Sequence, residues 1–261
     1  MPRLTKDQHN QIIIRYQDGE LCSDLAREFE VDRSSVYSLL QRRGVQMQDT
    51  SYVFRKASGH FLNESAFDIA SDDAAYWLGF LLADGAIVGN TISLCLQEKD
   101  SFHLEKFRQF VGGSQAILKI ESTNSCRYAF QSAKITNKLK EFGITERKSH
   151  TASVHSSLSN NVHFWRGMID GDGSIGIYPN HAKKTARVEL VGSIFVIFAF
   201  CRFVKQALGL TVNPKQNKGI HRVQIGGKPA AQVVNLLYED AITALDRKAL
   251  SAFEVWQWRN L

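Results

Sequence analysis

The chain has 261 residues, 44% hydrophobic and 22% charged, which excludes a disordered protein and provides for a sizeable core. It contains no run of eighteen apolar residues, no signal-peptide pattern and no CxxC pair among its four cysteines, so we expect a cytoplasmic protein with no membrane partner. The net charge is +6, and the excess lies in residues 161–261, which hold 13 Lys or Arg and 7 Asp or Glu; this favours a polyanionic partner.

Residues 1–45 are predicted to form a small all-α domain of three short helices. Thr5 and Gln8 have the spacing of a capping box that opens the first helix, and Gly19 suits its end. Asp32 is expected to cap the third helix. The three helices are expected at residues 7–17, 23–29 and 34–42.

The segment LAREFEVDRSSVYSLLQRRG in this domain resembles the helix-turn-helix of site-specific recombinases and phage regulators. The resemblance implies that the third helix enters a DNA major groove. Its outward residues would contact the DNA: Arg33, Ser35, Tyr37, Gln41 and Arg42. A small helical protein-interaction module is the alternative, because the domain has as many acidic as basic residues. Residues 46–72 show no firm period and are interpreted as a connector.

Residues 73–149 begin with an apolar helix that stops at an acidic residue, in the stretch WLGFLLADGAI at 77–87. Asp72 and Asp73 are expected to cap this helix, and Gly85 to end it in the left-handed conformation. A glycine inside a helix costs about 1 kcal/mol relative to alanine, so Gly79 predicts close approach of another backbone. Two short strands are expected after Gly85, around a hairpin turn at Gly89-Asn90, the second of them at 91–97. A helix at 102–111, strands at 116–122 and 126–132, and a helix at 135–142 are expected to follow.

Residues 150–261 repeat this order, starting from WRGMIDGDGSI at 165–175, where the Trp, Gly, Asp, Gly and Ile recur 88 residues later. Strands are expected at 174–178, 186–191, 211–216 and 222–225, and helices at 194–208 and 230–238. Gly167 and Gly173 match Gly79 and Gly85, and Asp172 matches Asp84. The pair Arg147-Lys148 recurs as Arg247-Lys248.

Two helices packed through their glycines would bring Asp84 and Asp172 side by side at their carboxyl ends. This arrangement is unfavourable for structure alone, because a helix C-terminus is already negative and two carboxylates repel each other. A divalent cation removes the conflict, and oxygen ligands without a matching Cys or His set indicate Mg²⁺. Core helices with acidic ends remain the alternative interpretation.

The sequences WLGFLLADG and WRGMIDGDG resemble the paired signatures of the LAGLIDADG homing endonucleases, in the single-chain form with two repeats. The resemblance implies an α+β fold: a pseudo-twofold pair of αββαββα repeats forming a saddle, preceded here by the helix-turn-helix domain. It also implies that Asp84 and Asp172 share two or three Mg²⁺ ions. The earlier aspartate of the signature is Leu82 in the first copy and Asp170 in the second.

In this family the polar faces of the two sheets lie along the DNA, and the matching candidates here are Ser93, Gln97, Arg127, Gln131, Lys183, Arg187, Lys215, Arg222 and Gln224. For each of them a solvated strand face is the alternative. Gln97 is also expected near the attacking water. Lys134 and Lys228 are the expected basic partners in catalysis, with ordinary surface lysines as the alternative.

The resemblance implies a metal-dependent, site-specific endonuclease that cuts double-stranded DNA at a long, partly palindromic target. Two repeats in one chain predict a monomer without an obligate protein partner. No protein-splicing signals are apparent at the ends, so we expect the product of a free-standing gene or an intron, in the cytoplasm of a bacterial or phage-infected cell. Two alternatives share the fold: a transcription regulator that binds DNA without cutting it, and a maturase that binds intron RNA. Two mutually repelling acids disfavour the regulator, because binding alone does not need them.

Overall fold

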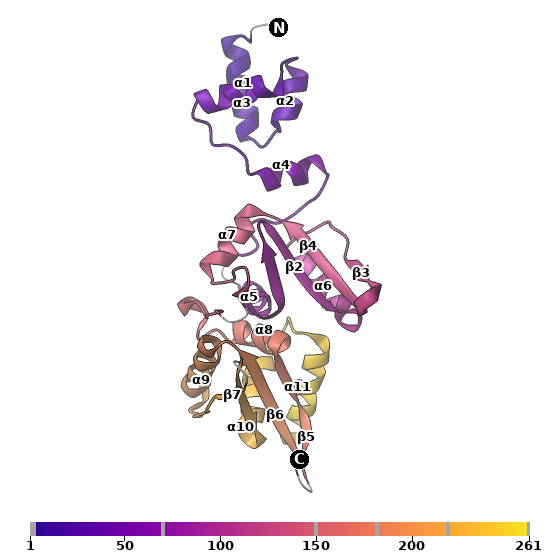
Figure 1. Cartoon of the computed structure of the whole chain (residues 1–261), viewed down its shortest axis with the longest axis vertical. Coiled ribbons are helices and arrows are strands. Elements are labelled where there is room, and N and C mark those ends of the chain that lie inside the picture. The colour runs from indigo at the N-terminus through magenta and orange to yellow at the C-terminus, as the bar shows by residue number, and fades with distance from the viewer. Residues whose placement is uncertain (1–3, 69–70, 149–150, 181–182, 218–219, 260–261) are drawn as a thin grey trace. The chain divides into compact units, whose positions relative to one another are not determined.

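The computed structural model describes residues 4–68, 71–148, 151–180, 183–217 and 220–259 (Figure 1). The chain divides into two compact units, Met1–Gly59 and His60–Leu261. Among the described residues, no helix is both long and apolar enough to span a membrane.

The first unit contains four helices: α1 (Lys6–Gln17), α2 (Cys22–Glu28), α3 (Arg33–Arg42) and α4 (Thr50–Ala57). The first three start and end within one residue of the predicted bounds, whereas α4 lies in the stretch where the sequence shows no period. The capping box is present, because Gln8 N donates to Thr5 Oγ1 at 3.2 Å and Thr5 N donates to Gln8 Oε1 at 2.9 Å. Asp32 precedes α3 as expected, but its side chain makes no capping hydrogen bond.

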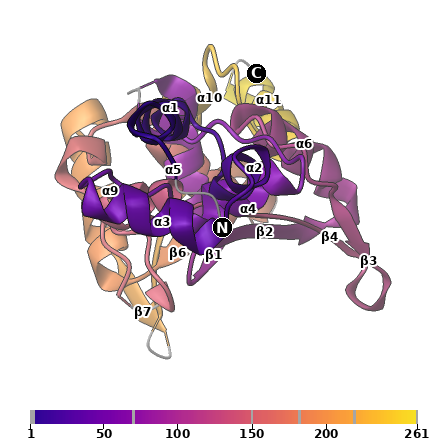
Figure 2. The same cartoon turned by 90° about the horizontal axis from the view of Figure 1, so that it is seen from above.

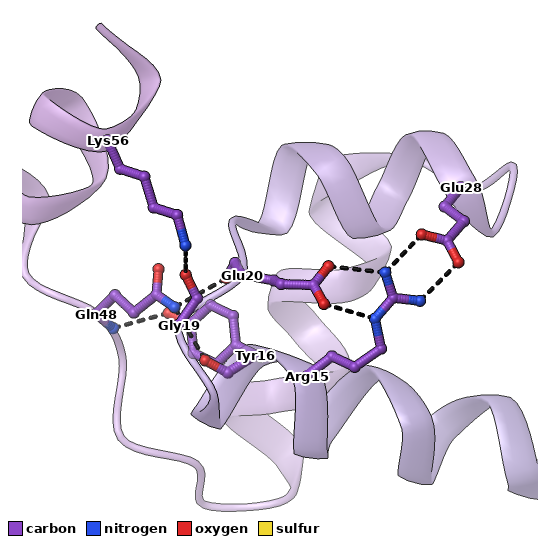
Figure 3. Close-up of polar contacts among 7 residues, drawn as sticks. All are labelled: Arg15, Tyr16, Gly19, Glu20, Glu28, Gln48 and Lys56. Carbon is purple, nitrogen blue, oxygen red and sulfur yellow. Dashed lines mark hydrogen bonds and ion pairs between the residues drawn. The ribbon is translucent and has the colours of Figure 1, made fainter. Parts of the chain in front are cut away.

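Two groups of polar contacts hold the first unit around its apolar centre (Figure 3). Arg15 donates to both Glu20 and Glu28, at distances of 2.6 to 2.8 Å. Gln48 donates from its side chain to Tyr16 O at 2.9 Å and Glu20 O at 2.8 Å, and from its backbone to Tyr16 Oη at 2.7 Å. The chain that follows α3 is therefore tied back to the turn between α1 and α2.

The second unit contains two four-stranded antiparallel sheets, with strand orders β1-β2-β4-β3 and β5-β6-β8-β7. The first repeat comprises α5 (Asp72–Asp84), β1 (Gly85–Val88), β2 (Thr91–Gln97), α6 (Ser101–Phe110), β3 (Leu118–Ile120), β4 (Ser125–Gln131) and α7 (Ala133–Glu141). The second comprises α8 (Val162–Asp172), β5 (Gly173–Asn180), β6 (Lys183–Gly192), α9 (Ile194–Leu208), β7 (Lys215–Asn217), β8 (Ile220–Gly226) and α10 (Gly227–Tyr238). The predicted α+β class and the predicted order of elements in each repeat are confirmed.

The two signature helices, α5 and α8, lie side by side between the sheets (Figure 1). A Cβ atom at Gly79 would overlap Phe164 O and lie 2.9 Å from Phe164 C. A Cβ atom at Gly167 would overlap Tyr76 O and lie 2.8 Å from Phe80 N. The predicted close approach of backbones is therefore confirmed, and each helix needs its glycine for it.

The ends of the signature helices differ from the prediction. Gly85 and Gly173 have φ values of −73° and −98°, so neither is left-handed. Each helix leads directly into a strand, and a Cβ at either glycine would lie 2.6 Å from the carbonyl oxygen four residues earlier. Crowding, and not a positive φ, therefore requires glycine there. At the start of α5 the capping residue is Ser71, which accepts from Ala74 N at 3.1 Å, while Asp72 and Asp73 occupy the first turn.

A further helix, α11 (Asp246–Arg259), was not predicted. Its buried residues are Lys248, Ala252 and Val255, whereas the larger apolar side chains Phe253 and Trp256 are exposed. An apolar pattern that faces outward gives no useful sign of a buried face. The helix packs on α10 and β5, and Figure 2 shows α6, α10 and α11 on the same side of the strands.

The substitution Gly79→Ala is expected to destabilise the protein by about 3 kcal/mol, because the new methyl group forces two helix backbones apart. Urea unfolding of the full chain measures this. Gly226→Ala is the matched control, since its Cβ would meet nothing closer than 3.9 Å. Equal stability of the two variants would contradict the backbone contact.

Candidate functional site

Asp84 and Asp172 are the last residues of α5 and α8. The contact at the glycines brings these two helix ends together. A Cβ added at Gly171, the residue before Asp172, would lie 3.2 Å from Asp84 Oδ2. Asp84 is exposed and Asp172 is partly exposed, so both carboxylates are accessible to a ligand from solvent.

The protein around the two carboxylates makes both more basic. Burial and then the neighbouring Asp84 raise the pKa of Asp172 to about 6. Although Asp84 is open to solvent, partial desolvation by the protein around it raises the pKa of this carboxyl group too, and Lys148, Arg247 and Lys248 act in the opposite direction. Two carboxylates that interact in this way form a site with a strong preference for positive charge.

A buried lysine caps each signature helix at the same place. Lys148 Nζ donates to Gly85 O and, at 3.4 Å, to Ala83 O. Lys248 Nζ donates to Gly173 O and, at 3.3 Å, to Ile169 O. Each ammonium group therefore stabilises the negative end of a helix beside the aspartates.

Burial lowers the pKa of Lys248 to about 8 and also lowers the pKa of Lys148. The sequence contained a signal for these two residues, namely the recurrence of the Arg-Lys pair in both repeats. No role followed from it, because the pattern does not reveal that the lysines return to the helix ends.

Asp170, the extra aspartate of the second signature, lies in surroundings that differ from those of Asp84 and Asp172. It is fully buried, and it accepts hydrogen bonds from Tyr76 Oη and Leu245 N, both at 2.7 Å, and from Tyr238 Oη at 2.5 Å. Leu82, its match in the first repeat, is buried and apolar. Asp170 therefore ties the helix pair to the chain between α10 and α11 and does not face the site.

Gln97 is exposed at the end of β2, three residues beyond Leu94, which pairs with Gly85. The same count from Leu190, which pairs with Gly173, leads to Ser193. Ser193 is buried, donates to Ala152 O and accepts from Val196 N at 3.2 Å. The polar residue expected near the water is therefore accessible in the first repeat only.

The structure does not bring Lys134 and Lys228 to the aspartates. Each lies at the start of a helix that follows β4 or β8. Gly85 lies in register with Tyr128 and Gly173 with Val223, so β4 and β8 each run three residues further from the aspartates before they end. Lys134 Nζ instead pairs with Asp68 Oδ2 at 2.8 Å, and Lys228 is exposed.

The predicted DNA-contacting residues of the strands share one open face in each sheet, and in β2, β4 and β8 they alternate with buried residues. The first sheet presents Ser93, Gln97, Arg127 and Gln131, and the second presents Lys183, Arg187, Lys215, Arg222 and Gln224. Arg187 lies over the ring of Tyr178 at 4.5 Å, and Arg222 Nη1 is 3.9 Å from Glu189 Oε2.

In the first unit, the five outward residues of α3 are exposed, while Val36, Leu39 and Leu40 form its buried side. Gln41 Nε2 donates to Tyr37 Oη at 3.3 Å. The unit thus presents Arg33, Ser35, Tyr37, Gln41 and Arg42 to solvent, as a recognition helix requires.

Comparison with solved structures relates this architecture to known proteins. The LAGLIDADG meganuclease I-AabMI, bound to uncleaved DNA, matches with a TM-score of 0.51 and 12% identity over 71% of this chain and 89% of its own. The LAGLIDADG homing endonuclease I-LtrWI, bound to target DNA, gives 0.51 and 11% over 76% and 92%, and a K262A mutant of I-SmaMI gives 0.51 and 12% over 71% and 92%. No protein-family model and no curated protein matches the chain.

These likenesses show that the chain has the LAGLIDADG fold, as the paired signatures predicted. Proteins with this fold that were solved with DNA include I-AabMI and I-LtrWI.

The substitution Asp172→Asn is expected to stabilise the metal-free protein by about 1 kcal/mol at about pH 8, and by less at about pH 4. The folded-state pKa of about 6 lies above the ordinary value, so the folded chain holds the proton more tightly and loses stability as the pH rises between about 4 and 6. Asparagine does not have this penalty. Urea unfolding in EDTA at both pH values measures the difference, and a difference that does not change with pH would contradict it.

Proposed function

We propose that the protein is a site-specific endonuclease that hydrolyses phosphodiester bonds in double-stranded DNA. The observation that carries the proposal is the pair of carboxylates, Asp84 and Asp172, held at adjoining helix ends with a buried lysine behind each. The DNA-bound state of I-AabMI and I-LtrWI, which have the same fold, supports DNA as the substrate.

The donor set fits Mg²⁺, because the neighbouring Asp84 and the surrounding protein raise the pKa of Asp172, and a hard divalent cation beside the two carboxylates would relieve this repulsion. Asp84 and Asp172 would hold the ions. When bound, Mg²⁺ polarises the scissile phosphate and lowers the pKa of an attacking water.

The chain's own residues would support hydrolysis in two further ways. Lys148 and Lys248 hold the helix ends that carry the aspartates, and their ammonium groups add positive charge near the two scissile phosphates. Gln97 is accessible at the end of β2, where its side chain can orient a water on one side of the centre.

Recognition is proposed to use the open faces of the two sheets, with Arg187, Arg222 and Gln224 suited to base edges. The pseudo-twofold arrangement of the repeats fits a long, partly palindromic target. One chain carries both repeats, so we propose a monomer. The outward side of α3 would contact additional DNA through its major groove.

The native chain is expected to be stabilised by millimolar Mg²⁺, since a ligand of the folded state raises the free energy of unfolding. The melting temperature should increase with the logarithm of the Mg²⁺ concentration. This gain should be absent in Asp172→Asn and retained in Asp240→Asn, which removes an exposed carboxylate elsewhere in the same unit. The same Mg²⁺ response in all three proteins would contradict metal binding at the aspartates.

With Mg²⁺, the native chain is expected to cut one site in a randomised duplex library. Asp84→Asn and Asp172→Asn should each lower the cleavage rate at this site at least about 100-fold, because the two aspartates together would hold the Mg²⁺ ions. Asp240→Asn is again the control. Binding of one DNA sequence without cutting would instead favour the regulator, and preferential binding of intron RNA would favour the maturase.

A further inference from the structure

The surroundings of the aspartate pair Asp84 and Asp172, called the centre below, differ between the two repeats. An arginine is held in place on the Asp84 side. Arg247, the second residue of α11, donates from Nε to Asp100 Oδ2 at 2.9 Å and to Oδ1 at 3.2 Å. Asp100 is buried in the short 3-10 turn Glu98–Asp100, which directly follows Gln97. The second repeat thus extends a guanidinium group to the first.

The residues on both sides of Arg247 are held in place by contacts of their own. Asp246 Oδ1 lies 2.6 Å from Lys106 Nζ, and Lys248 caps α8. Leu245, two residues before Arg247, donates from its backbone N to the buried Asp170. The position of Arg247 is therefore fixed by its neighbours as well as by Asp100.

The guanidinium group remains available to a ligand. Its side chain is 47% exposed, and its pairing with Asp100 uses Nε. It lies close enough to Asp84 to lower the pKa of that carboxyl group, together with Lys148 and Lys248. A half-exposed arginine whose Nε holds a carboxylate retains further N–H groups that can donate to a phosphate oxygen.

The first repeat does not place a comparable arginine, held by a buried carboxylate, on the Asp172 side. Arg147, the sequence match of Arg247, has a left-handed backbone with φ of +55° and is exposed. Within the described part of the chain it forms no ion pair. Asp100 directly precedes α6, and the residue that directly precedes α9 is Ser193, which donates to Ala152 O, so the second repeat has no carboxylate at this place to hold Arg147.

We propose that Arg247, positioned by Asp100, binds the DNA phosphate on the Asp84 side, and that the protein therefore cuts the strand on this side faster than the strand at Asp172. The inference rests on the proposed function and deepens it. Gln97 acts on the same side, since Ser193 is buried in the other repeat. One half of the centre thus carries both accessory groups.

The test measures the two strands separately, on a duplex target with a different label on each strand. The native chain is expected to cut one strand faster in Mg²⁺. Arg247→Ala should slow that strand at least about 10-fold and the other less than about 3-fold, as expected for the loss of one charged hydrogen bond. Arg147→Ala, the matched control, should leave both rates unchanged.

Arg247→Ala leaves Asp100 buried without its partner, so a second variant guards against misfolding. The double substitution of Arg247→Gln with Asp100→Asn keeps a hydrogen-bonding pair without charge. We expect it to melt close to the native temperature and to show the same loss on one strand. A merely structural role predicts slower cutting of both strands in proportion to a lower melting temperature.

The possible failures are distinguishable. A native chain that cuts neither strand contradicts the proposed function and this inference with it. A native chain that cuts both strands, at rates that the Arg247 variants change equally or not at all, contradicts this inference alone.

Discussion

The second unit depends on the contact between the backbones of α5 and α8. Gly79 lies against Phe164, and Gly167 lies against Tyr76, at a separation that no side chain tolerates. Close packing of the two helices determines how far apart their carboxyl ends lie and therefore how strongly Asp84 and Asp172 interact. The sheets continue directly from the same helix ends, so the contact also sets the spacing between the two open faces.

Close approach at the carboxyl ends collects negative charge, and the structure compensates for it in two ways. The buried ammonium groups of Lys148 and Lys248 bond the carbonyl oxygens at the helix ends. Asp170 is surrounded by hydroxyl and amide donors, which offset the cost of burying a carboxylate. The second compensation exists in one repeat only, because Leu82 replaces the acid in the other.

Local patterns in the sequence were sufficient for most of the fold. Residues 194–208 were predicted with the bounds of α9, and the structure shows what sets them: Ser193 caps the start, and Gly209 ends the helix in the left-handed conformation. Alternation in residues 91–97 similarly defined β2 and its open face. The paired signatures also predicted that the two aspartates lie together. Glycine and aspartate have the same spacing in both copies, so a contact between the glycines brings the aspartates to the same level.

Features that depend on distant parts of the chain were not predictable in this way. The lysines that cap α5 and α8 come from segments 64 and 76 residues after these helices end. The helix α11 buries a lysine, an alanine and a valine and exposes larger aromatic residues, so its apolar periodicity indicates the wrong face. Lys134 in the first repeat matches Lys228 in the second. The strands that precede these lysines nevertheless run away from the aspartates, which only the strand register reveals.

The direct passage from helix to strand at Gly85 and Gly173 has a mechanical consequence. No loop separates Asp84 from β1 or Asp172 from β5, so each carboxylate and the strand after it move as one piece. If DNA lies on the open faces as proposed, a base sequence that fits one sheet poorly and tilts it also rotates the aspartate at its root. Discrimination between targets would then operate on the chemical step itself, and a poorly fitting duplex could be held without being cut.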